Sequence, residues 1–186
     1  PLAGKRRLQL KLKKLKYDLV VDLRNTVMGL LIGPKYRTAT IQHFPSGIIH
    51  SIDKHLHRLK SIGIENCERR TYLYITPEDE TYVSGLLKAS GVRDNFVVIN
   101  PGSRSHLKRW TQEGYADLAD RIAGESKADI VFIGTKEDEV IVAGVMSRMK
   151  QKSHNFIGKT GVRQLGGLLK RSKLLITNDS APLHIG

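Results

Sequence analysis

Apolar residues in the second half of the chain follow two alternating patterns. Short continuous runs rich in valine and isoleucine, such as Phe96–Asn100, are typical of strands buried on both faces of a sheet. Between these runs apolar residues recur every three or four positions, as at Tyr115, Leu118 and Ile122, which predicts amphipathic helices. In chain order the predicted strands and helices are Phe96–Asn100, a helix after Thr111, Ala128–Ile133, Glu137–Met149, Asn155–Ile157, Val162–Leu169 and Leu174–Thr177. This alternation through short links predicts an α/β fold with a parallel, doubly wound sheet and right-handed crossovers.

The first half of the chain is less regular. The run Tyr17–Leu23 also predicts a buried strand, and its end near Asp22 would face a ligand cleft. Asp22 suits either a carboxylate that caps the following loop or a group that faces substrate. The other predicted elements are helices within 8–15, 27–32, 48–64 and 76–90, the last capped by Thr76, and strands at 37–44 and 72–75. A junction at Gly91–Asn95 then divides the chain into domains of residues 1–92 and 93–186.

Basic residues outnumber acidic ones, with 31 lysines and arginines against 18 aspartates and glutamates, for a formal net charge of +13. Such a charge attracts nucleic acid, anionic lipid or a phosphorylated small molecule. Seven basic residues precede the first acidic residue, Asp18, namely Lys5, Arg6, Arg7, Lys11, Lys13, Lys14 and Lys16. This segment predicts peripheral contact with a membrane surface or another polyanion. Nucleic acid is the less favoured partner, because aromatic residues are few and no recognition motif accompanies the lysines.

The single cysteine, Cys67, cannot form a disulfide within the chain, which favours a reducing, cytoplasmic location. No apolar run approaches the roughly 18 residues that cross a bilayer. The chain has no initiator methionine and ends at Gly186, where a helix is expected to begin. We therefore expect a fragment that is cut at both ends.

The stretch that joins the strand ending at Asn100 to the helix after Thr111 carries the clearest chemistry. It reads N-P-G-S-R-S-H-L-K-R-W and lies at the carboxyl end of a strand, where ligands of α/β sheets bind. Gly102 lets the backbone approach a ligand closely, and the side chains of Ser103, Arg104, Lys108 and Arg109 offer hydroxyl and cationic donors that suit a phosphate. We interpret it as half of an anion pocket. For Trp110 and Thr111 a structural role is favoured, as hydrophobic staple with Tyr115 and as N-cap.

A second polar loop, Asn178-Asp179-Ser180, follows the last predicted strand and precedes an expected helix. Asp179 or Ser180 would cap that helix, and the remaining free N–H groups at its start can hold a pyrophosphate. Spacing alone favours an ordinary surface role for His184, one turn further on. Glu137 and Glu139, after the Gly134 turn, are either ribose acceptors or simple first-turn acids.

Several other motifs are absent or weak. Gly158-Lys159-Thr160 lacks the preceding glycine of a Walker loop, and the glycine fingerprint of dinucleotide dehydrogenases does not follow any visible strand. His50, Asp53 and His57 share one helical face, but the apolar stripe beside them is an ordinary core-facing pattern. We therefore expect no metal site.

Taken together, these blocks resemble the ordered motifs of glycosyltransferase family 9, the lipopolysaccharide heptosyltransferases. The blocks are Asn100-Pro101-Gly102-Ser103 with Lys108-Arg109-Trp110, Gly134 with the acids after it, Gly158-Lys159-Thr160 with Leu165, and Asn178-Asp179-Ser180-Ala181-Pro182-Leu183-His184. Tyr17–Leu23 is similar to a late strand of that family's first domain. The likeness spans nearly the whole chain.

The resemblance implies a GT-B fold of two facing Rossmann-like domains with parallel sheets, both incomplete here. Residues 1–92 would belong to the acceptor domain and residues 93–186 to the nucleotide-sugar domain. The implied reaction is inverting transfer of heptose from ADP-heptose to the lipopolysaccharide inner core, with no metal or other cofactor. The family's catalytic base is an aspartate in a region outside this chain, so we expect little or no turnover from these 186 residues alone.

The resemblance also assigns roles to individual residues. Ser103 and Lys108 would contact the donor phosphates, and Lys108 would stabilise the departing diphosphate. Arg104 stands where relatives can have a hydroxyl. The remaining assignments are Glu137 or Glu139 to the ribose, Thr160 to the adenine, and Asp179, Ser180 and Ala181 to the sugar and pyrophosphate, with His184 nearby. The alternative to a transferase is a non-catalytic module that binds a nucleotide or a polyanion.

Overall fold

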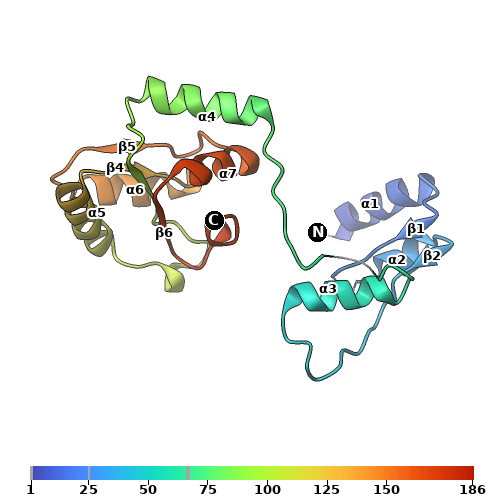
Figure 1. Cartoon of the computed structure of the whole chain (residues 1–186). Coiled ribbons are helices and arrows are strands. Elements are labelled where there is room, and N and C mark those ends of the chain that lie inside the picture. Colours follow the sequence, from blue (N-terminus) through green and yellow to red (C-terminus); the bar gives the residue numbers. More distant parts are fainter. Residues whose placement is uncertain (1, 25, 66–67) are drawn as a thin grey trace. The chain divides into compact units, whose positions relative to one another are not determined.

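The computed structural model describes residues 2–24, 26–65 and 68–186, and Figure 1 shows the course of the chain. Two compact units are present, a first unit of Pro1–Thr71 and a second unit of Tyr72–Gly186. Cys67, on which the expectation of a reducing environment rested, lies outside the described residues. Within the described chain no helix is both long enough and apolar enough to cross a membrane.

A four-stranded parallel sheet organises the second unit. Its strands are β3 (Phe96–Asn100), β4 (Asp129–Phe132), β5 (Ser153–Asn155) and β6 (Leu174–Thr177), in the order β5-β4-β3-β6. Phe96 pairs with Asp129 on one side of β3, and Val97 pairs with Leu174 on the other. The chain thus runs outward from β3 to β5 and returns to the opposite side of β3. The predicted parallel, doubly wound α/β arrangement is confirmed.

Helices cover both faces of this sheet because the strands are apolar on both faces. The helices are α4 (Pro77–Ala89), α5 (Gln112–Ser126), α6 (Glu139–Met146) and α7 (Val162–Arg171). Val97 and Ile99 pack in a cluster with residues of α5 and α6, whereas Phe96 and Val98 pack in a second cluster with residues of α4 and α7. Alternate residues of one strand therefore serve two separate cores, as expected for a central strand.

The helix α4 belongs to the second unit, although the sequence placed it before the domain junction. Val83 and Leu87 of α4 are buried in the cluster that contains Phe96 of β3 and Leu168 of α7. The compact units therefore divide before α4, at Thr71–Tyr72, instead of after residue 92. Which unit holds acceptor and which holds donor stays a prediction.

Some predicted elements differ from the structure. Residues 72–75 form no strand, because Leu73 and Ile75 pack against Gly166 and Gly167 of α7 instead of pairing with a neighbouring strand. The predicted strand at 37–44 is reduced to β2 (Tyr36–Arg37), and β5 begins two residues before the predicted Asn155. The helix expected after Ser180 is a single 3-10 turn, η3 (Ala181–His184).

The first unit contains α1 (Leu2–Lys14), β1 (Leu19–Val20), α2 (Met28–Ile32), β2 and α3 (Ser51–Lys60), and β1 and β2 pair in parallel. Asp22 accepts hydrogen bonds from the backbone N–H groups of Arg24 and Thr26, at 2.8 and 2.9 Å, and from the Thr26 hydroxyl. Burial alone would raise the pKa of Asp22, but these hydrogen bonds lower it. Of the two roles left open for Asp22, the structure supports the loop-capping one.

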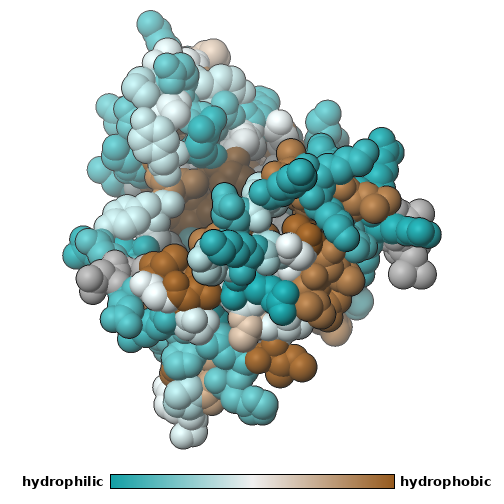
Figure 2. Space-filling view, turned by 90° about the vertical axis from the view of Figure 1, so that its right-hand side faces the viewer, coloured by the Kyte–Doolittle hydropathy of each residue, from teal (hydrophilic) through white to brown (hydrophobic). Residues whose placement is uncertain are grey.

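Few apolar side chains are buried in the first unit. Among the described residues, Ile32 is its only buried apolar side chain in the hydrophobic core. Several others are exposed, including Leu8, Leu10, Leu15, Tyr36, Ile41 and Ile49, and apolar patches lie between hydrophilic side chains in Figure 2. The well-packed core of the described chain therefore lies in the second unit.

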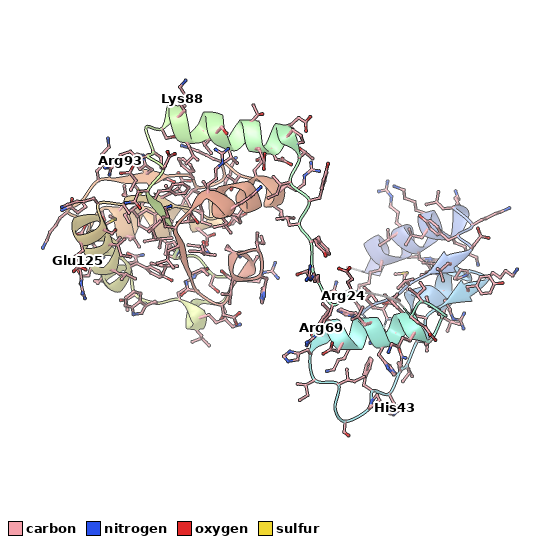
Figure 3. All side chains as sticks on the ribbon, viewed as in Figure 1. Arg24, His43, Arg69, Lys88, Arg93 and Glu125 are labelled. Carbon is pink, nitrogen blue, oxygen red and sulfur yellow. The ribbon has the colours of Figure 1, made fainter. Side chains whose placement is uncertain are left out.

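An ion pair joins the chain before β3 to the start of β4. Arg93, labelled in Figure 3, donates from its backbone N–H (2.7 Å), from Nε (3.1 Å) and from Nη2 (2.6 Å) to the Asp129 carboxylate. Hydrogen bonds from Arg93 outweigh burial and lower the pKa of Asp129. A carboxyl whose folded-state pKa is depressed stabilises the fold above its unfolded-state pKa and loses that contribution as pH falls through the folded-state value.

We therefore predict that Asp129→Asn lowers the free energy of unfolding by about 1–2 kcal/mol at pH 7, because the largely buried side chain at position 129 no longer offers Arg93 a charged acceptor. The difference from wild type should shrink as the pH falls below about 4. Urea unfolding of both proteins at a series of pH values measures this difference in the free energy of unfolding. A difference that stays constant down to pH 3 would contradict the assignment.

Candidate functional site

The strand order changes direction at β3, so the carboxyl end of β3 is the topological switch point of the sheet. After β3 the chain moves toward β4, and the loop after β6 leaves from the strand on the other side of β3. In open parallel sheets, ligands bind outside the carboxyl ends of the strands at such a switch point. Two loops flank it, residues 101–111 after β3 and residues 178–184 after β6.

An ion pair bridges these two loops. The Lys108 ammonium, at the end of the 3-10 turn η1 (His106–Lys108), donates to the Asp179 carboxylate. The hydrogen bond and charge of Lys108 hold the pKa of Asp179 below its ordinary value. Both side chains are more than half exposed, so a ligand at this switch point can reach them. The prediction that Asp179 or Ser180 caps the next helix is wrong. Ser180 occupies the N-cap position of η3, but its side chain makes no capping hydrogen bond, and the Asp179 carboxylate is paired with Lys108 instead.

Asn178 joins the same two loops beneath the ion pair. Its side chain is buried, and its Oδ1 accepts from the Trp110 backbone N–H at 3.2 Å and from the Tyr115 hydroxyl at 2.9 Å. Its Nδ2 donates to the Pro101 carbonyl at 2.9 Å. Burial raises the pKa of Tyr115, which keeps this hydroxyl protonated as a donor.

Asn100, the last residue of β3, makes a similar set of contacts between the two loops. Its buried Nδ2 donates to the hydroxyls of Thr177 (3.1 Å) and Ser180 (3.0 Å) and, more weakly, to the Gly102 carbonyl (3.3 Å). Ser180 is thereby fixed to the sheet. Two buried amides thus tie the loop after β3 to the loop after β6.

The loops after β4 and β5 continue the same edge. Asp138 accepts from the backbone N–H of Thr135 at 2.9 Å and from its hydroxyl at 3.0 Å. The Asp138 side chain lies against both Gly102 and Gly134, and a Cβ atom at Gly102 would collide with its carboxylate. The backbone N–H of Gly158 donates to the Gly134 carbonyl at 3.0 Å, which joins the β4 and β5 loops.

The structure places the predicted site residues along this edge, with different degrees of contact. Ser103 is buried, and its carbonyl accepts a hydrogen bond from Arg109 at 2.8 Å. Lys108 and Asp179 pair directly. The exposed residues are Arg104, Glu137, Glu139, Ala181 and His184, whereas Thr160, in the loop after β5, is half-buried. The hydroxyl of Thr135 lowers the pKa of Glu137.

The structural roles expected around Trp110 are confirmed. The Thr111 hydroxyl accepts from the Gly114 backbone N–H at 3.1 Å and caps α5. The Trp110 and Tyr115 rings meet edge to face, with centroids 5.2 Å apart, as in a hydrophobic staple.

The sequence alone assigned no role to Asn100, Asn178 or Asp138, although each residue lies inside or beside one of the family motifs. Asn100 ends β3 and Asn178 directly follows β6, and both side chains are buried, where an amide needs partners. Those partners lie far away in the sequence, up to 80 residues for Asn100 and Ser180, so spacing could not identify them.

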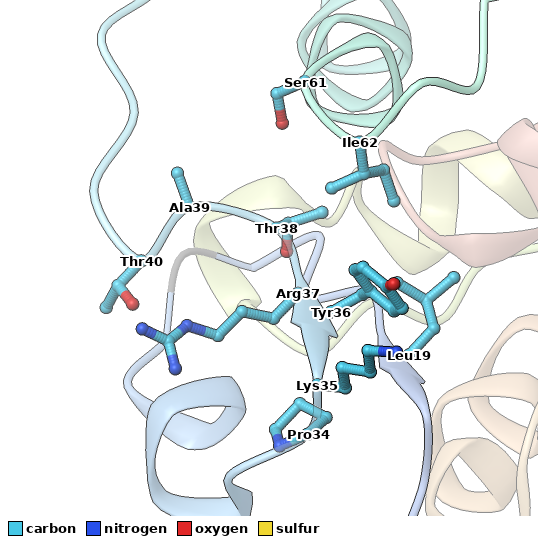
Figure 4. Close-up of a pocket in the computed structure, with 10 residues that line it drawn as sticks. All are labelled: Leu19, Pro34, Lys35, Tyr36, Arg37, Thr38, Ala39, Thr40, Ser61 and Ile62. Carbon is cyan, nitrogen blue, oxygen red and sulfur yellow. The ribbon is translucent and has the colours of Figure 1, made fainter.

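The first unit has a separate open pocket of about 900 Å³, lined among others by Lys35, Tyr36, Arg37 and Ile62. Figure 4 shows Arg37 and Tyr36 pointing to opposite sides of β2, as neighbouring strand residues do. The pocket therefore follows the short strand and contains none of the predicted site residues. On α3, Asp53 pairs with Arg69 at 2.9 Å.

Comparison with known proteins agrees with this geometry. Residues 54–186 match the sequence profile of glycosyltransferase family 9 (heptosyltransferase). The chain belongs to glycosyltransferase family 9. Among curated members, it is 29% identical over 138 residues to the lipopolysaccharide core heptosyltransferase OpsX of Haemophilus influenzae, covering 73% of this chain and 39% of OpsX. It is 26% identical over 138 residues to lipopolysaccharide heptosyltransferase 3 of Escherichia coli K12, covering 73% of this chain and 40% of that protein.

Solved structures of family 9 proteins share the fold. The crystal structure of the family 9 glycosyl transferase from Veillonella parvula has a TM-score of 0.79 at 23% identity and covers 96% of this chain and 57% of that one. The structure of E. coli ADP-heptose LPS heptosyltransferase II has a TM-score of 0.76 at 19% identity, and the match covers 99% of this chain and 63% of that one. The parallel sheets and these matches confirm an incomplete GT-B-type fold. The chain spans about two fifths of the length of the curated family 9 proteins that it matches first.

The contact between Gly102 and Asp138 yields a prediction for this family 9 chain. Gly102→Ala should lower the free energy of unfolding by about 1–3 kcal/mol, because the new Cβ displaces the Asp138 carboxylate from Thr135. Adding Asp138→Ala should relieve the collision, so that the double variant is more stable than the sum of the single effects predicts. Thermal or urea unfolding of all four proteins measures the coupling, and additive effects would disprove it.

Proposed function

We propose that this protein is an inverting glycosyltransferase that moves heptose from ADP-heptose to the inner core of lipopolysaccharide. The observation that carries the proposal is the Lys108–Asp179 pair at the switch point of a parallel sheet, inside the family 9 match. The curated family members are named as lipopolysaccharide heptosyltransferases, and one solved structure is titled as the E. coli heptosyltransferase WaaC with ADP. These names support a nucleotide-sugar donor and a lipopolysaccharide acceptor.

In this proposal the second unit binds the donor. Transfer of the sugar leaves a diphosphate, whose growing negative charge needs cationic or N–H donors. Lys108 supplies the cation, and Ser103 and Arg104 lie on the same loop. A donor diphosphate would replace Asp179 as the partner of Lys108, which frees the Asp179 carboxylate to accept hydrogen bonds from sugar hydroxyls.

The other assignments follow the order of the loops. Glu137 or Glu139, beside the β4 loop, would hold the ribose, and Thr160, in the β5 loop, would lie by the adenine. Ser180, Ala181 and His184 would line the sugar and pyrophosphate side. Neither a metal nor another cofactor is part of this proposal. Asp22 is not assigned as the base, because its carboxylate already accepts hydrogen bonds from Arg24 and Thr26.

Calorimetric titration of the chain with ADP-heptose and ADP, beside GDP and UDP, tests the donor site. We expect adenine nucleotides to bind selectively. Lys108→Ala should weaken both ADP and ADP-heptose about tenfold or more, since it removes a charged phosphate donor. Asp179→Ala should weaken ADP-heptose but not ADP, because its carboxylate contacts the sugar alone.

The matched control is Arg121→Ala, which breaks an exposed Arg121–Glu125 ion pair on α5 outside the two loops that flank the switch point. It should leave both affinities unchanged. If a folded wild-type chain binds UDP or GDP as tightly as ADP, an ADP-sugar donor is ruled out. If nothing binds, the alternative of a polyanion-binding module gains support.

We further propose that α1 contacts the anionic inner face of the membrane, where the lipopolysaccharide acceptor would be presented. Its described side chains include six basic residues and no acidic one. Arg6, Arg7, Lys11 and Lys14 line a hollow on its surface together with the half-exposed Leu10. Clustered cations beside apolar side chains suit a headgroup layer.

Binding of the chain to vesicles of phosphatidylglycerol and phosphatidylethanolamine, measured by sedimentation, tests this contact. Replacing Arg6, Lys11 and Lys14 by glutamate should weaken binding at least about tenfold, since each basic residue near such a surface contributes about 1 kcal/mol. The control changes Lys88, Lys150 and Lys152 to glutamate, which alters the net charge equally. Equal losses in both variants would show that net charge, and not α1, drives binding.

A further inference from the structure

The turn Pro101-Gly102-Ser103 has both of its first two carbonyls bound inside the protein. The Pro101 carbonyl accepts from Asn178 Nδ2 at 2.9 Å. The Gly102 carbonyl accepts from two amides, Asn100 Nδ2 at 3.3 Å and Asn178 Nδ2 at 3.4 Å. Two asparagines from neighbouring strands therefore set the orientation of two successive peptide planes.

A trans peptide plane carries its carbonyl oxygen and its N–H on opposite sides. With the Pro101 and Gly102 carbonyls held by buried amides, the N–H groups of Gly102 and Ser103 are directed the other way. Within the described part of the chain, neither N–H donates a hydrogen bond to another protein group. Both residues are nevertheless buried, and buried N–H groups require an acceptor. Successive backbone N–H groups with a common direction form an anion-binding concavity.

The network permits only one orientation of the Asn178 amide. The Trp110 N–H can only donate, so it must face Oδ1, and the Pro101 carbonyl can only accept, so it must face Nδ2. Aspartate has nearly the same shape but offers no donor to the carbonyls unless it is protonated. Asparagine at 178 is therefore required by hydrogen-bond polarity and not by size.

We propose that Asn100 and Asn178 are positioning residues that present the Gly102 and Ser103 N–H groups to the diphosphate of the donor. The identity of the diphosphate rests on the function proposed above. The two amides act through the backbone and touch no substrate themselves. Lys108, further along the same loop, attracts the diphosphate by its charge, whereas the two N–H groups donate hydrogen bonds in a fixed direction.

The test uses pyrophosphate and ADP as probes with the full 186-residue chain. In wild type, pyrophosphate should shift the backbone amide NMR signals of Gly102 and Ser103. Asn178→Asp should weaken pyrophosphate and ADP about tenfold and abolish those two shifts, because the Pro101 and Gly102 carbonyls both lose a donor and face a carboxylate. Asn100→Asp should weaken both probes to a smaller extent and reduce the Ser103 shift, because only the Gly102 carbonyl loses a donor. Asn100→Asp can still accept from the Thr177 and Ser180 hydroxyls, so it changes the Gly102 contact selectively.

Two controls separate positioning from stability. Asn95→Asp makes the same chemical change to a side chain whose Nδ2 donates to the Ser126 carbonyl at 3.0 Å, before β3 begins. Val142→Ala removes buried methyl groups from α6 and lowers the melting temperature. Both should retain wild-type affinity and both amide shifts at a temperature well below melting.

Wild type that binds pyrophosphate without shifts at Gly102 and Ser103 would overturn the inference, even if both aspartate variants failed to fold. If Asn178→Asp and Asn100→Asp fold and bind pyrophosphate and ADP as tightly as wild type, the inference is overturned as well. The proposed function would still stand in that case, because wild type binds ADP. Failure of wild type to bind ADP or pyrophosphate would overturn both.

Discussion

The order of the strands is the constraint on which the rest of this chain depends. Because β3 is central and the chain leaves it toward β4 but returns on the side of β6, the loops after β3 and β6 meet at the switch point of the sheet. Two residues that are 71 positions apart, Lys108 and Asp179, meet there. The strands can occupy this order because their alternate side chains fill separate cores on the two faces of the sheet.

Different kinds of interaction hold these loops in place and equip them for binding. The Lys108–Asp179 pair is exposed, and exposed ion pairs contribute little to stability because water and salt screen them. The amides of Asn100 and Asn178 are buried, where a lost partner costs about 1–3 kcal/mol. The buried amides therefore maintain the geometry of the loops. The ion pair can be exchanged for a charged ligand at small cost to the fold.

The sequence predicted most of what is encoded locally. The alternation of strands and helices after residue 96, the N-caps Thr76 and Thr111, and the Trp110–Tyr115 staple all depend on residues within a few positions of one another, and all are confirmed. The wrong predictions concern residues whose local preference is overridden by a partner that lies far away in the sequence. Asp179 is a good local cap but pairs with Lys108, and the apolar run at 72–75 packs on α7 although its composition equally suits a strand. The family resemblance pointed to the loops after β3 and β6, whereas the contacts of Asn100 and Asn178 became visible only when the structure brought these loops together.

The choice of asparagine at both positions follows from the charge of the proposed ligand. A buried aspartate beside the Pro101 and Gly102 carbonyls would repel those carbonyls and a diphosphate alike. A buried lysine or arginine would attract the ligand, but its charge would need a partner in the interior at a desolvation cost of several kcal/mol. A neutral amide donates to two carbonyls and accepts from Trp110 and Tyr115 without either penalty. Positive charge is left to exposed side chains such as Lys108, where water screens it until a ligand binds. The two buried amides stay neutral while the exposed part of the loop attracts phosphate.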